Sequence, residues 1–413
     1  MEDESSYDYW RFNVKYLYDY LYSEHIDWST MTCQFLPGVA VDAETGSSIV
    51  QFISGTSSSQ TVPNYIHVVQ VMVPRESFIP FEEVFTVEPD ELPCEGYGKN
   101  AQMRVVKSIK TPNEVNKVRY CPAKPNLVAG FIANAEVQIY DLSIKSVTNE
   151  TPSHSPAPVF SLTGHIDEGF GLSWSNLDVP MLVSGGNDGR ICVWDVSAAS
   201  RGVSNPPLFS IDYHQKPVED VQFHPRSANV LASVADDGKF CIWDLRVDQY
   251  SKPRIIVRTS DELNTVAWNN FRDPIVSCSG KSKDVFLYDT RNCNRPLHAM
   301  KKHDAEIITS QWSPYDETVL VTADISGNVF MWDISAVKDK AAENSLPELI
   351  FAHGGHESRV NDISFSPDIS NLVMTCEDER VVQLWQPSSG VLDQINPNNW
   401  PLVVATGTTS SVV

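Results

Sequence analysis

Carboxylates recur at a fixed position along the chain. Four glutamates each stand six residues before an aromatic residue: Glu114, Glu168, Glu262 and Glu306. Glu219 stands four residues before such an aromatic, and Asp236 in a later turn can join the set. Carboxylates gathered around a half-enclosed mouth focus negative potential and bind Lys or Arg through charge-assisted hydrogen bonds. The spacing therefore predicts a site for a basic peptide, and the alternative is a solvated acidic rim.

These carboxylates do not predict catalysis. General acid–base chemistry needs a pair of groups with separated pKa values beside a substrate pocket, and the sequence indicates neither. The chain also has no phosphate-cradling glycine loop, no GxSxG and no HExxH. Phe170 and Ile308 stand close to the glutamates and are expected to pack against the methylenes of a bound basic side chain. We expect a binding protein with no catalytic residue and no cofactor.

A second set of polar residues repeats in the same units. Four of six units carry a histidine nine residues before the aromatic and a Ser or Thr ten residues after it. In two units a turn Asp and a Trp complete the set, which comprises His165, Ser184, Asp188 and Trp194, then His214, Ser233, Asp237 and Trp243. Buried polar groups must be paired, so these residues predict structural hydrogen-bond chains. Because no cysteine or histidine spacing matches a zinc site, we expect no metal.

The elements that position these residues form a repeat. Five runs of β-forming residues end in Trp-Asp or Tyr-Asp, at 140–141, 194–195, 243–244, 288–289 and 332–333, and a sixth ends at 385–386. This spacing is typical of a four-stranded propeller blade with loop insertions. Residues 30–73 lack the signature but contain three strand-like runs, which makes a seventh blade. We predict an all-β fold, a seven-bladed WD40 β-propeller whose chain ends pair in one blade and leave no free edge.

Residues 8–25 interrupt the β pattern. Trp10, Val14, Leu17 and Leu21 recur at helical spacing, and a second stripe contains Tyr9, Phe12, Tyr16 and Tyr20. We predict an N-terminal α-helix packed on the propeller rim. The second stripe either accepts a partner helix or belongs to one wide buried face. The predicted organisation is an N-terminal helix at 1–29, a propeller at 30–395 with an insert at 334–353, and a C-terminal tail at 396–413. The insert is either a binding loop or an ordinary connection.

Charge and hydropathy exclude two classes of partner. With 31 Lys and Arg against 53 Asp and Glu, the net charge is −22. This argues against direct nucleic-acid binding, because phosphate affinity comes from Lys and Arg. The chain has no 18-residue apolar run, and its first nine residues lack the features of a signal peptide. We expect an intracellular protein without membrane contact.

Eight segments resemble the nuclear histone-binding WD-repeat proteins, first described as retinoblastoma-binding proteins and as the small subunit of chromatin assembly factor 1. The resemblance extends from about residue 9 to residue 385. The segments are WRFNVKYLYDYLYSEHIDW (10–28), EVNKVRY (114–120), LTGHIDEGFGLSW (162–174), ICVWDVSA (191–198), VEDVQFHP (218–225), SVADDGKFCIWDLR (233–246), QWSPYDETVL (311–320) and LPELIFAHGGH (346–356).

The resemblance implies two histone-tail sites. The first lies between the N-terminal helix and the insert and takes the first helix of histone H4, which here points to Tyr16, Leu17, Glu343, Phe351 and Val391. The second lies across the channel and takes the H3 tail or an H3-like Arg/Lys motif. It points to Glu114, Asn116, Glu168, Phe170, Glu219, Asp236, Glu306 and Ile308. This second set largely coincides with the carboxylates found by register.

Departures from the family pattern identify a divergent member. The insert has one proline, with Lys338, Lys340 and Asn344 in its acidic stretch. Phe170 stands where a Tyr is usual, and Ile308 where a Phe is usual. The altered insert bears on the charged half of the H4 site, so the H3 site is the stronger of the two predictions.

The resemblance implies a histone-binding scaffold or chaperone subunit. It would present H3 and H4 to catalytic partners in chromatin-assembly, histone acetyltransferase, deacetylase or Polycomb complexes, in the nucleus with or without a cytoplasmic pool. The alternative is a WD40 substrate receptor of a cullin-RING ubiquitin ligase. Two Trp/Tyr-Asp-x-Arg segments, which end at Arg246 and Arg291, resemble the adaptor-docking motif of such receptors. Arginine also commonly follows a Trp-Asp turn, so both interpretations stay open.

Overall fold

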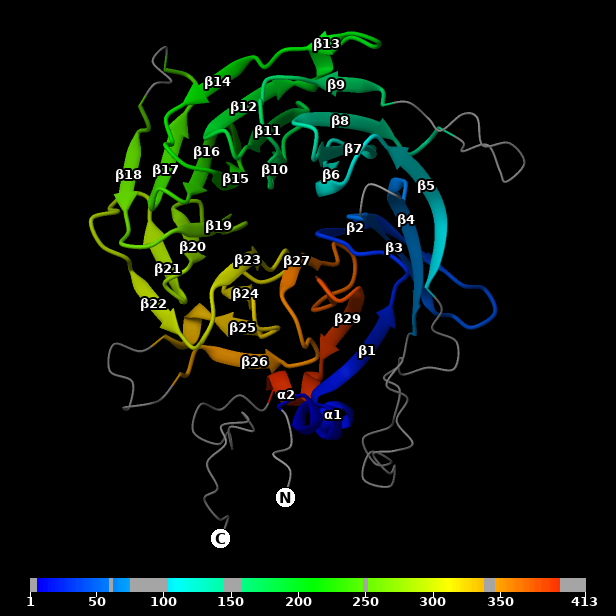
Figure 1. Cartoon of the computed structure of the whole chain (residues 1–413). Coiled ribbons are helices and arrows are strands. Elements are labelled where there is room, and N and C mark those ends of the chain that lie inside the picture. The colour runs from blue at the N-terminus through cyan, green and yellow to red at the C-terminus, as the bar shows by residue number, and fades with distance from the viewer. Residues whose placement is uncertain are drawn as a thin grey trace.

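Seven sheets surround a central axis (Figure 1). The computed structural model describes residues 6–58, 62–74, 103–144, 158–247, 252–337 and 346–393. In each blade the first strand lies nearest the axis and the later strands lie progressively outward. The seven-bladed β-propeller predicted from the repeats is therefore confirmed. No helix in these ranges is long and apolar enough to cross a membrane.

The first four blades follow one another around the ring. Blade 1 contains β2 (Thr32–Val41), β3 (Ser48–Gly55), β4 (Asn64–Val73) and β5 (Arg104–Thr111). Blade 2 contains β6 (Val115–Cys121), β7 (Lys124–Ile132), β8 (Glu136–Asp141) and β9 (Phe160–Leu162), with β13 (Ser204–Asn205) added parallel to β9. Blade 3 contains β10 (Gly171–Trp174), β11 (Met181–Gly185), β12 (Arg190–Asp195) and β14 (Phe209–Asp212). Blade 4 contains β15 (Val218–His224), β16 (Ser227–Ala235), β17 (Lys239–Asp244) and β18 (Ile255–Arg258).

The last three blades complete the ring. Blade 5 contains β19 (Leu263–Trp268), β20 (Ile275–Gly280), β21 (Asp284–Asp289) and β22 (His298–Lys301). Blade 6 contains β23 (Ile307–Trp312), β24 (Val319–Asp324), β25 (Val329–Asp333) and β26 (Leu349–His353). Blade 7 contains β27 (Val360–Phe365), β28 (Val373–Glu377), β29 (Val381–Pro387) and the N-terminal strand β1 (Tyr18–His25). The helices are α1 (Ser6–Leu17) and α2 (Ser389–Asp393), with 3-10 turns at Val196–Ala198 and Ile334–Ala336.

The hydrophobic core lies between neighbouring blades. One cluster, for example, joins Phe131 and Ile139 of blade 2 to Trp174 and Leu182 of blade 3. Among the largest fully buried side chains are tryptophans of first and third strands, Trp243, Trp312, Trp332 and Trp385. Each large aromatic buries on the order of 150–250 Å². The repeated aromatics therefore stack the blades at a regular angle and hold their first strands around one axis.

The N-terminal helix is shorter than predicted, because residues 18–25 form a strand. In β1, Leu21 and Tyr20 belong to different core clusters and lie on opposite faces of the sheet, as the two-residue period of a strand requires. β1 also pairs with β29 over its length, from Tyr18 opposite Pro387 to His25 opposite Val381. Tyrosine favours strands, and this pairing outweighs the helical spacing. The predicted helix over 8–25 is therefore wrong beyond Leu17.

Part of the predicted insert also belongs to the propeller. Residues 349–353 form β26, the outer strand of blade 6, and residues 334–336 form a 3-10 turn. Residues 338–345, which include Glu343, lie outside the described ranges, as does the predicted tail at 396–413. The apolar residues at 349–351 satisfy a sheet edge, and their hydrophobicity alone did not separate a loop tip from a strand.

An ion cluster in the channel joins the blades on both sides of the ring closure. Asp362 of blade 7 accepts two hydrogen bonds from Arg119, each at 2.9 Å, and lies 3.1 Å from the Lys117 ammonium. It also accepts from the Thr32 hydroxyl and the Cys33 backbone N–H of blade 1. Burial opposes ionisation, but the charges of Arg119 and Lys117 outweigh it and hold the pKa of Asp362 far below its usual range.

Candidate functional site

The predicted carboxylates lie where the innermost strands begin. Glu114 directly precedes β6, Glu306 directly precedes β23, Glu219 lies in β15, and Glu168 stands three residues before β10. The first strands start at the same end of the channel, because each blade repeats the same sheet order. We call this end the upper mouth. The spacing found in the sequence therefore corresponds to a ring of positions around one opening.

Asparagines of the preceding blade position two of the glutamates. Asn116 donates from Nδ2 to Glu168 Oε2 at 2.9 Å and to the Gly169 carbonyl at 3.3 Å. Asn264 makes the same pair of bonds one blade before Glu306, at 2.8 Å to Oε1 and 2.8 Å to the backbone carbonyl of residue 307. Sequence reasoning named Asn116 and missed Asn264. The signal was present, because both stand four residues before the first-strand aromatic.

Three carboxylates on blades 4 to 6 interact through their charges. Burial raises the pKa of Glu219 to about 7, and the negative charges of Asp236, Asp220 and Glu306 raise it further against the opposing charge of Arg359. Burial also raises the pKa of Asp236, and Glu306 adds to that rise. Among the described residues, no Lys or Arg forms an ion pair with Glu219, Asp236 or Glu306. This trio is therefore a site of unneutralised negative charge.

The rest of the mouth is less uniform than the register predicts. Glu262 already pairs with Lys216 at 3.2 Å and Lys281 at 3.0 Å, which lower its pKa. In blade 7 the position six residues before the aromatic is Arg359. Spacing alone could not reveal these differences, because the two lysines come from turns outside the repeated register. The acidity of the mouth is thus concentrated on two sides.

The second acidic side lies on blades 2 and 3. It contains Glu114, which accepts a hydrogen bond from the Ser57 hydroxyl at 3.3 Å, and the positioned Glu168. Phe170 and Ile308 are half-buried and stand four residues before the aromatics of blades 3 and 6. Together these residues offer carboxylates and apolar surface to a peptide that carries spaced basic side chains.

The histidine sets form hydrogen-bond chains in the core. His165 Nε2 lies 2.7 Å from Ser184 Oγ and its Nδ1 lies 3.1 Å from Asp188, but the Trp194 indole N–H has no partner among the described residues. The chain predicted for this blade therefore stops at the hydroxyl. No group of three or more His, Cys, Asp or Glu in the described ranges is placed to hold a metal ion.

The next blade extends the chain through the indole. His214 bonds Ser233 at 2.9 Å and Asp237 at 3.1 Å, and Trp243 Nε1 donates to the same hydroxyl at 2.9 Å. Burial lowers the pKa of His214 although Asp237 opposes the shift, so this imidazole is neutral at physiological pH. Because the groups are buried and paired, they stabilise the blade.

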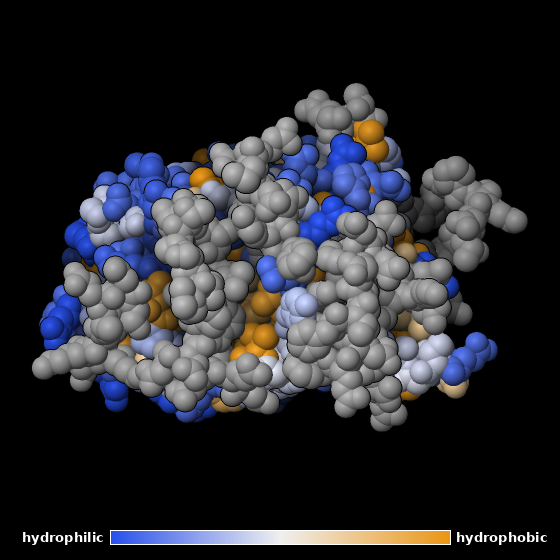
Figure 2. All heavy atoms as spheres, turned by 90° about the horizontal axis from the view of Figure 1, so that it is seen from below, coloured by the Kyte–Doolittle hydropathy of each residue, from blue (hydrophilic) through white to orange (hydrophobic). Residues whose placement is uncertain are grey.

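The residues named for the H4 site lie near α1 in differing environments. Tyr16 is exposed at the surface of the helix, while Leu17 and Val391 are partly buried against the same core cluster. Phe351 lies inside that cluster, only 2% exposed, stacked on Trp385. Figure 2 views this edge of the disc and shows apolar surface between the grey residues. The described part of the groove is therefore formed by α1 and α2 and not by the Phe351 side chain.

Sheet order, repeated aromatics and the acidic mouth define a WD-repeat β-propeller with a peptide-binding type of opening. A sequence model described as histone-binding protein RBBP4 or a component of the CAF1 complex matches residues 5–75, and the WD domain, G-beta repeat model matches 153–195, 205–244 and 347–386. The chain belongs to this family of WD-repeat proteins, and the resemblance found in the sequence is confirmed.

Relatives match the chain over nearly its whole length. WD-40 repeat-containing protein MSI3 of Arabidopsis thaliana is 30% identical over 406 residues, which cover 94% of this chain and 90% of the relative. Histone acetyltransferase type B subunit 2 of Neurospora crassa is also 30% identical over 406 residues, covering 94% and 89%. The Candida glabrata protein of the same name is 27% identical over 395 residues, covering 95% and 90%.

Proposed function

We propose that this protein is a non-enzymatic histone-binding subunit whose upper mouth takes the N-terminal tail of H3 or a similar Arg/Lys motif. The observation that carries the proposal is the carboxylate trio Glu219, Asp236 and Glu306, which has no described cationic partner. Ionised groups that lose water are stabilised by opposite charges, so a basic side chain completes the site. The names of the relatives support assembly with a histone acetyltransferase, and we propose nuclear chromatin complexes as the setting.

Calorimetry of the purified protein against an unmodified H3 N-terminal peptide tests this proposal. We expect a Kd on the order of micromolar that weakens as salt rises, because ions screen charges at the mouth. Glu262→Gln is the matched control: its carboxylate is already neutralised by two lysines, so the affinity should hardly change. Absence of binding by correctly folded protein would refute the proposal.

Tail binding should strengthen as pH rises from 6 to 8. The raised pKa of Glu219, about 7, means that this carboxyl is largely protonated at pH 6 and ionised at pH 8. An N-acetylated H3 peptide removes the titrating α-amino group of the ligand. We expect its affinity to rise about three- to tenfold over this range, given tenfold per pKa unit. Glu219→Gln should flatten the profile measured by calorimetry, and an unchanged slope would contradict the assignment.

We also propose that α1 forms one wall of an H4-helix site. Replacing Leu17 by aspartate places a charge on partly buried apolar surface, so H4-helix binding should weaken by about tenfold or more while H3 binding stays normal. Fluorescence polarisation with the two labelled peptides measures both. Tyr16→Ala at the exposed neighbouring position tests the groove without disturbing the core. Equal loss of both peptides in Leu17→Asp would instead indicate that the helix no longer docks.

Docking to a cullin-RING adaptor is the second candidate. Arg246 and Arg291 are exposed at equivalent positions of neighbouring blades, which favours a shared docking surface. Each guanidinium also pairs with the aspartate of its own motif, Asp244 or Asp289. A pull-down with the purified adaptor, repeated with Arg246→Ala combined with Arg291→Ala, separates docking from a purely local turn role. Adaptor capture that ignores both substitutions would count against this candidate.

A further inference from the structure

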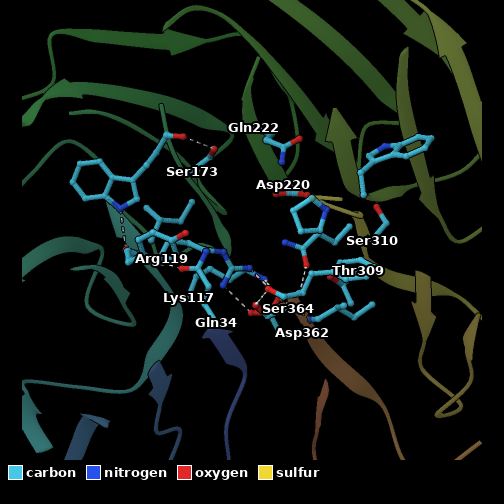
Figure 3. Close-up of a pocket in the computed structure, with 18 of the residues that line it drawn as sticks. Gln34, Lys117, Arg119, Ser173, Asp220, Gln222, Thr309, Ser310, Asp362 and Ser364 are labelled. Atoms are coloured by element: carbon cyan, nitrogen blue, oxygen red, sulfur yellow. Dashed lines mark hydrogen bonds and ion pairs between the residues drawn. The ribbon is translucent and has the colours of Figure 1, made fainter. Parts of the chain in front are cut away.

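A polar cavity of about 280 Å³ lies on the axis at the end of the channel opposite the acidic mouth (Figure 3). Its rim comes from residues just after the first strands, including Pro122, Asn176, Asn270, Pro314 and Pro367. We call this end the lower mouth. Its wall contains the residue that immediately precedes the first-strand aromatic in most of the blades.

That residue bonds each blade to the next one. In five blades its side-chain oxygen accepts the backbone N–H of the next blade's aromatic: Gln34 from Tyr120, Ser173 from Phe223, Gln222 from Trp268, Gln311 from Phe365 and Ser364 from Phe35. Arg119 and Ala267 hold the other two positions and cannot accept. There the next blade has a tryptophan, whose indole N–H donates to the backbone carbonyl of Arg119 or Ala267. The bonds form a closed ring of seven.

These bonds orient the three glutamine amides. Because Oε1 of Gln34, Gln222 and Gln311 accepts from a strand, the NH₂ group of each amide is left for the cavity that all three residues line. Each NH₂ group offers two donors, and these amides donate to no described residue. In Figure 3 the side chains of Gln34 and Gln222 lie at the cavity wall. The ring consumes its acceptors and presents donors to the lumen.

The nearby charges favour a single negative charge over two. The accessible part of the ion cluster is cationic: the Lys117 and Arg119 side chains are 15% and 18% exposed, and the Asp362 side chain is 1% exposed. Asp220 also lines the cavity and accepts the backbone N–H of Val266. Its carboxylate opposes a doubly charged ligand, because like charges at short range in a low dielectric repel strongly.

We propose that the lower mouth is a second ligand site that binds a carboxylate, held by the amides of Gln34, Gln222 and Gln311 beside Arg119. The carboxylate belongs to an acidic side chain or chain terminus of a peptide, or to a small free acid. This site is separate from the upper mouth, because the two use opposite ends of the first strands and ligands of opposite charge.

Saturation-transfer NMR on the full chain, in buffer free of carboxylate and phosphate, tests the proposal with acetate and its neutral isostere acetamide as probes. We expect a signal for acetate at least fivefold that for acetamide. Gln222→Glu and Gln311→Glu each keep the oxygen that accepts the strand N–H and replace the NH₂ group by a second oxygen. Each should reduce the acetate signal at least fivefold, with circular dichroism unchanged.

Gln215→Glu is the matched control, because it adds the same charge at an exposed position beyond the cavity and should bind acetate normally. Equal signals for acetate and acetamide, or acetate binding by Gln222→Glu and Gln311→Glu as strong as by Gln215→Glu, would overturn the proposal. Displacement of acetate by an equal concentration of inorganic phosphate would overturn the preference for a single charge. Acetate binding should persist in Glu168→Lys/Glu306→Lys, so the H3 proposal can fail independently.

Discussion

Replacing both Glu168 and Glu306 by lysine should abolish binding of the H3 tail peptide, raising Kd at least about 100-fold. The two residues lie on the two acidic sides of the upper mouth, and each is held by an asparagine of the preceding blade. Charge reversal removes two charge-assisted contacts and adds repulsion of the basic peptide. A loss of about 1.5–3 kcal/mol for each contact to a charged group accounts for a change of this size, at 1.4 kcal/mol per tenfold.

The measurement is calorimetry on protein whose folding is verified by thermal melting. Glu262→Lys is the matched control, since it reverses a carboxylate in the same register that two lysines already neutralise. It should weaken binding far less than the double substitution. Wild-type affinity in a folded Glu168→Lys/Glu306→Lys protein would rule out the upper mouth as the tail site.

Replacing Asp362 by asparagine should destabilise the fold by about 3–5 kcal/mol, the usual result of removing one partner of a buried ion pair. The substitution leaves Lys117 and Arg119 without their counter-charge and weakens the contacts to blade 1. Urea unfolding of both proteins measures the difference. Because Asp362 has its pKa lowered on folding, its contribution is complete above the unfolded value, near 3.9, and is lost as pH falls toward the folded pKa.

Glu357→Gln provides the control for Asp362→Asn, because it removes one negative charge from an exposed position just before β27 of the same blade. Its unfolding free energy should stay within about 0.5 kcal/mol of wild type. If Asp362→Asn changed stability as little as this control, the ion cluster would not hold the closure of the ring.

The repeat made the propeller and the upper mouth predictable, because register converts directly into position on a ring. Glu114, Glu168 and Glu306 needed only their distance from an aromatic residue. What spacing could not supply was the state of each carboxylate, since that depends on side chains from other loops. Glu262 carries the same register and is neutralised by Lys216 and Lys281. Asn264 shared a visible register with Asn116 and was overlooked because its own blade has no histidine.

The errors fall where two kinds of element fit the same residues. The segment 18–25 has apolar residues that suit either a helix or a strand, and only the partner strand β29, more than 350 residues later, decides between them. Phe351 resembled a loop tip until its strand paired with β25 and its ring met Trp385. The Trp194 indole shows the converse case, in which all four residues of a predicted chain are present and the last bond is not made.

Blade 7 combines the earliest strand of the chain with three of the last ones, and this has a consequence for synthesis. β1 leaves the ribosome first, yet its partner β29 begins only at Val381. Until then the nascent ring has open ends, and β1 exposes an unpaired strand edge that invites pairing with other chains. Such a chain depends on protection of its N-terminal segment during translation. Loss of a few residues at 381–387 would leave every other blade intact in sequence and still open the ring.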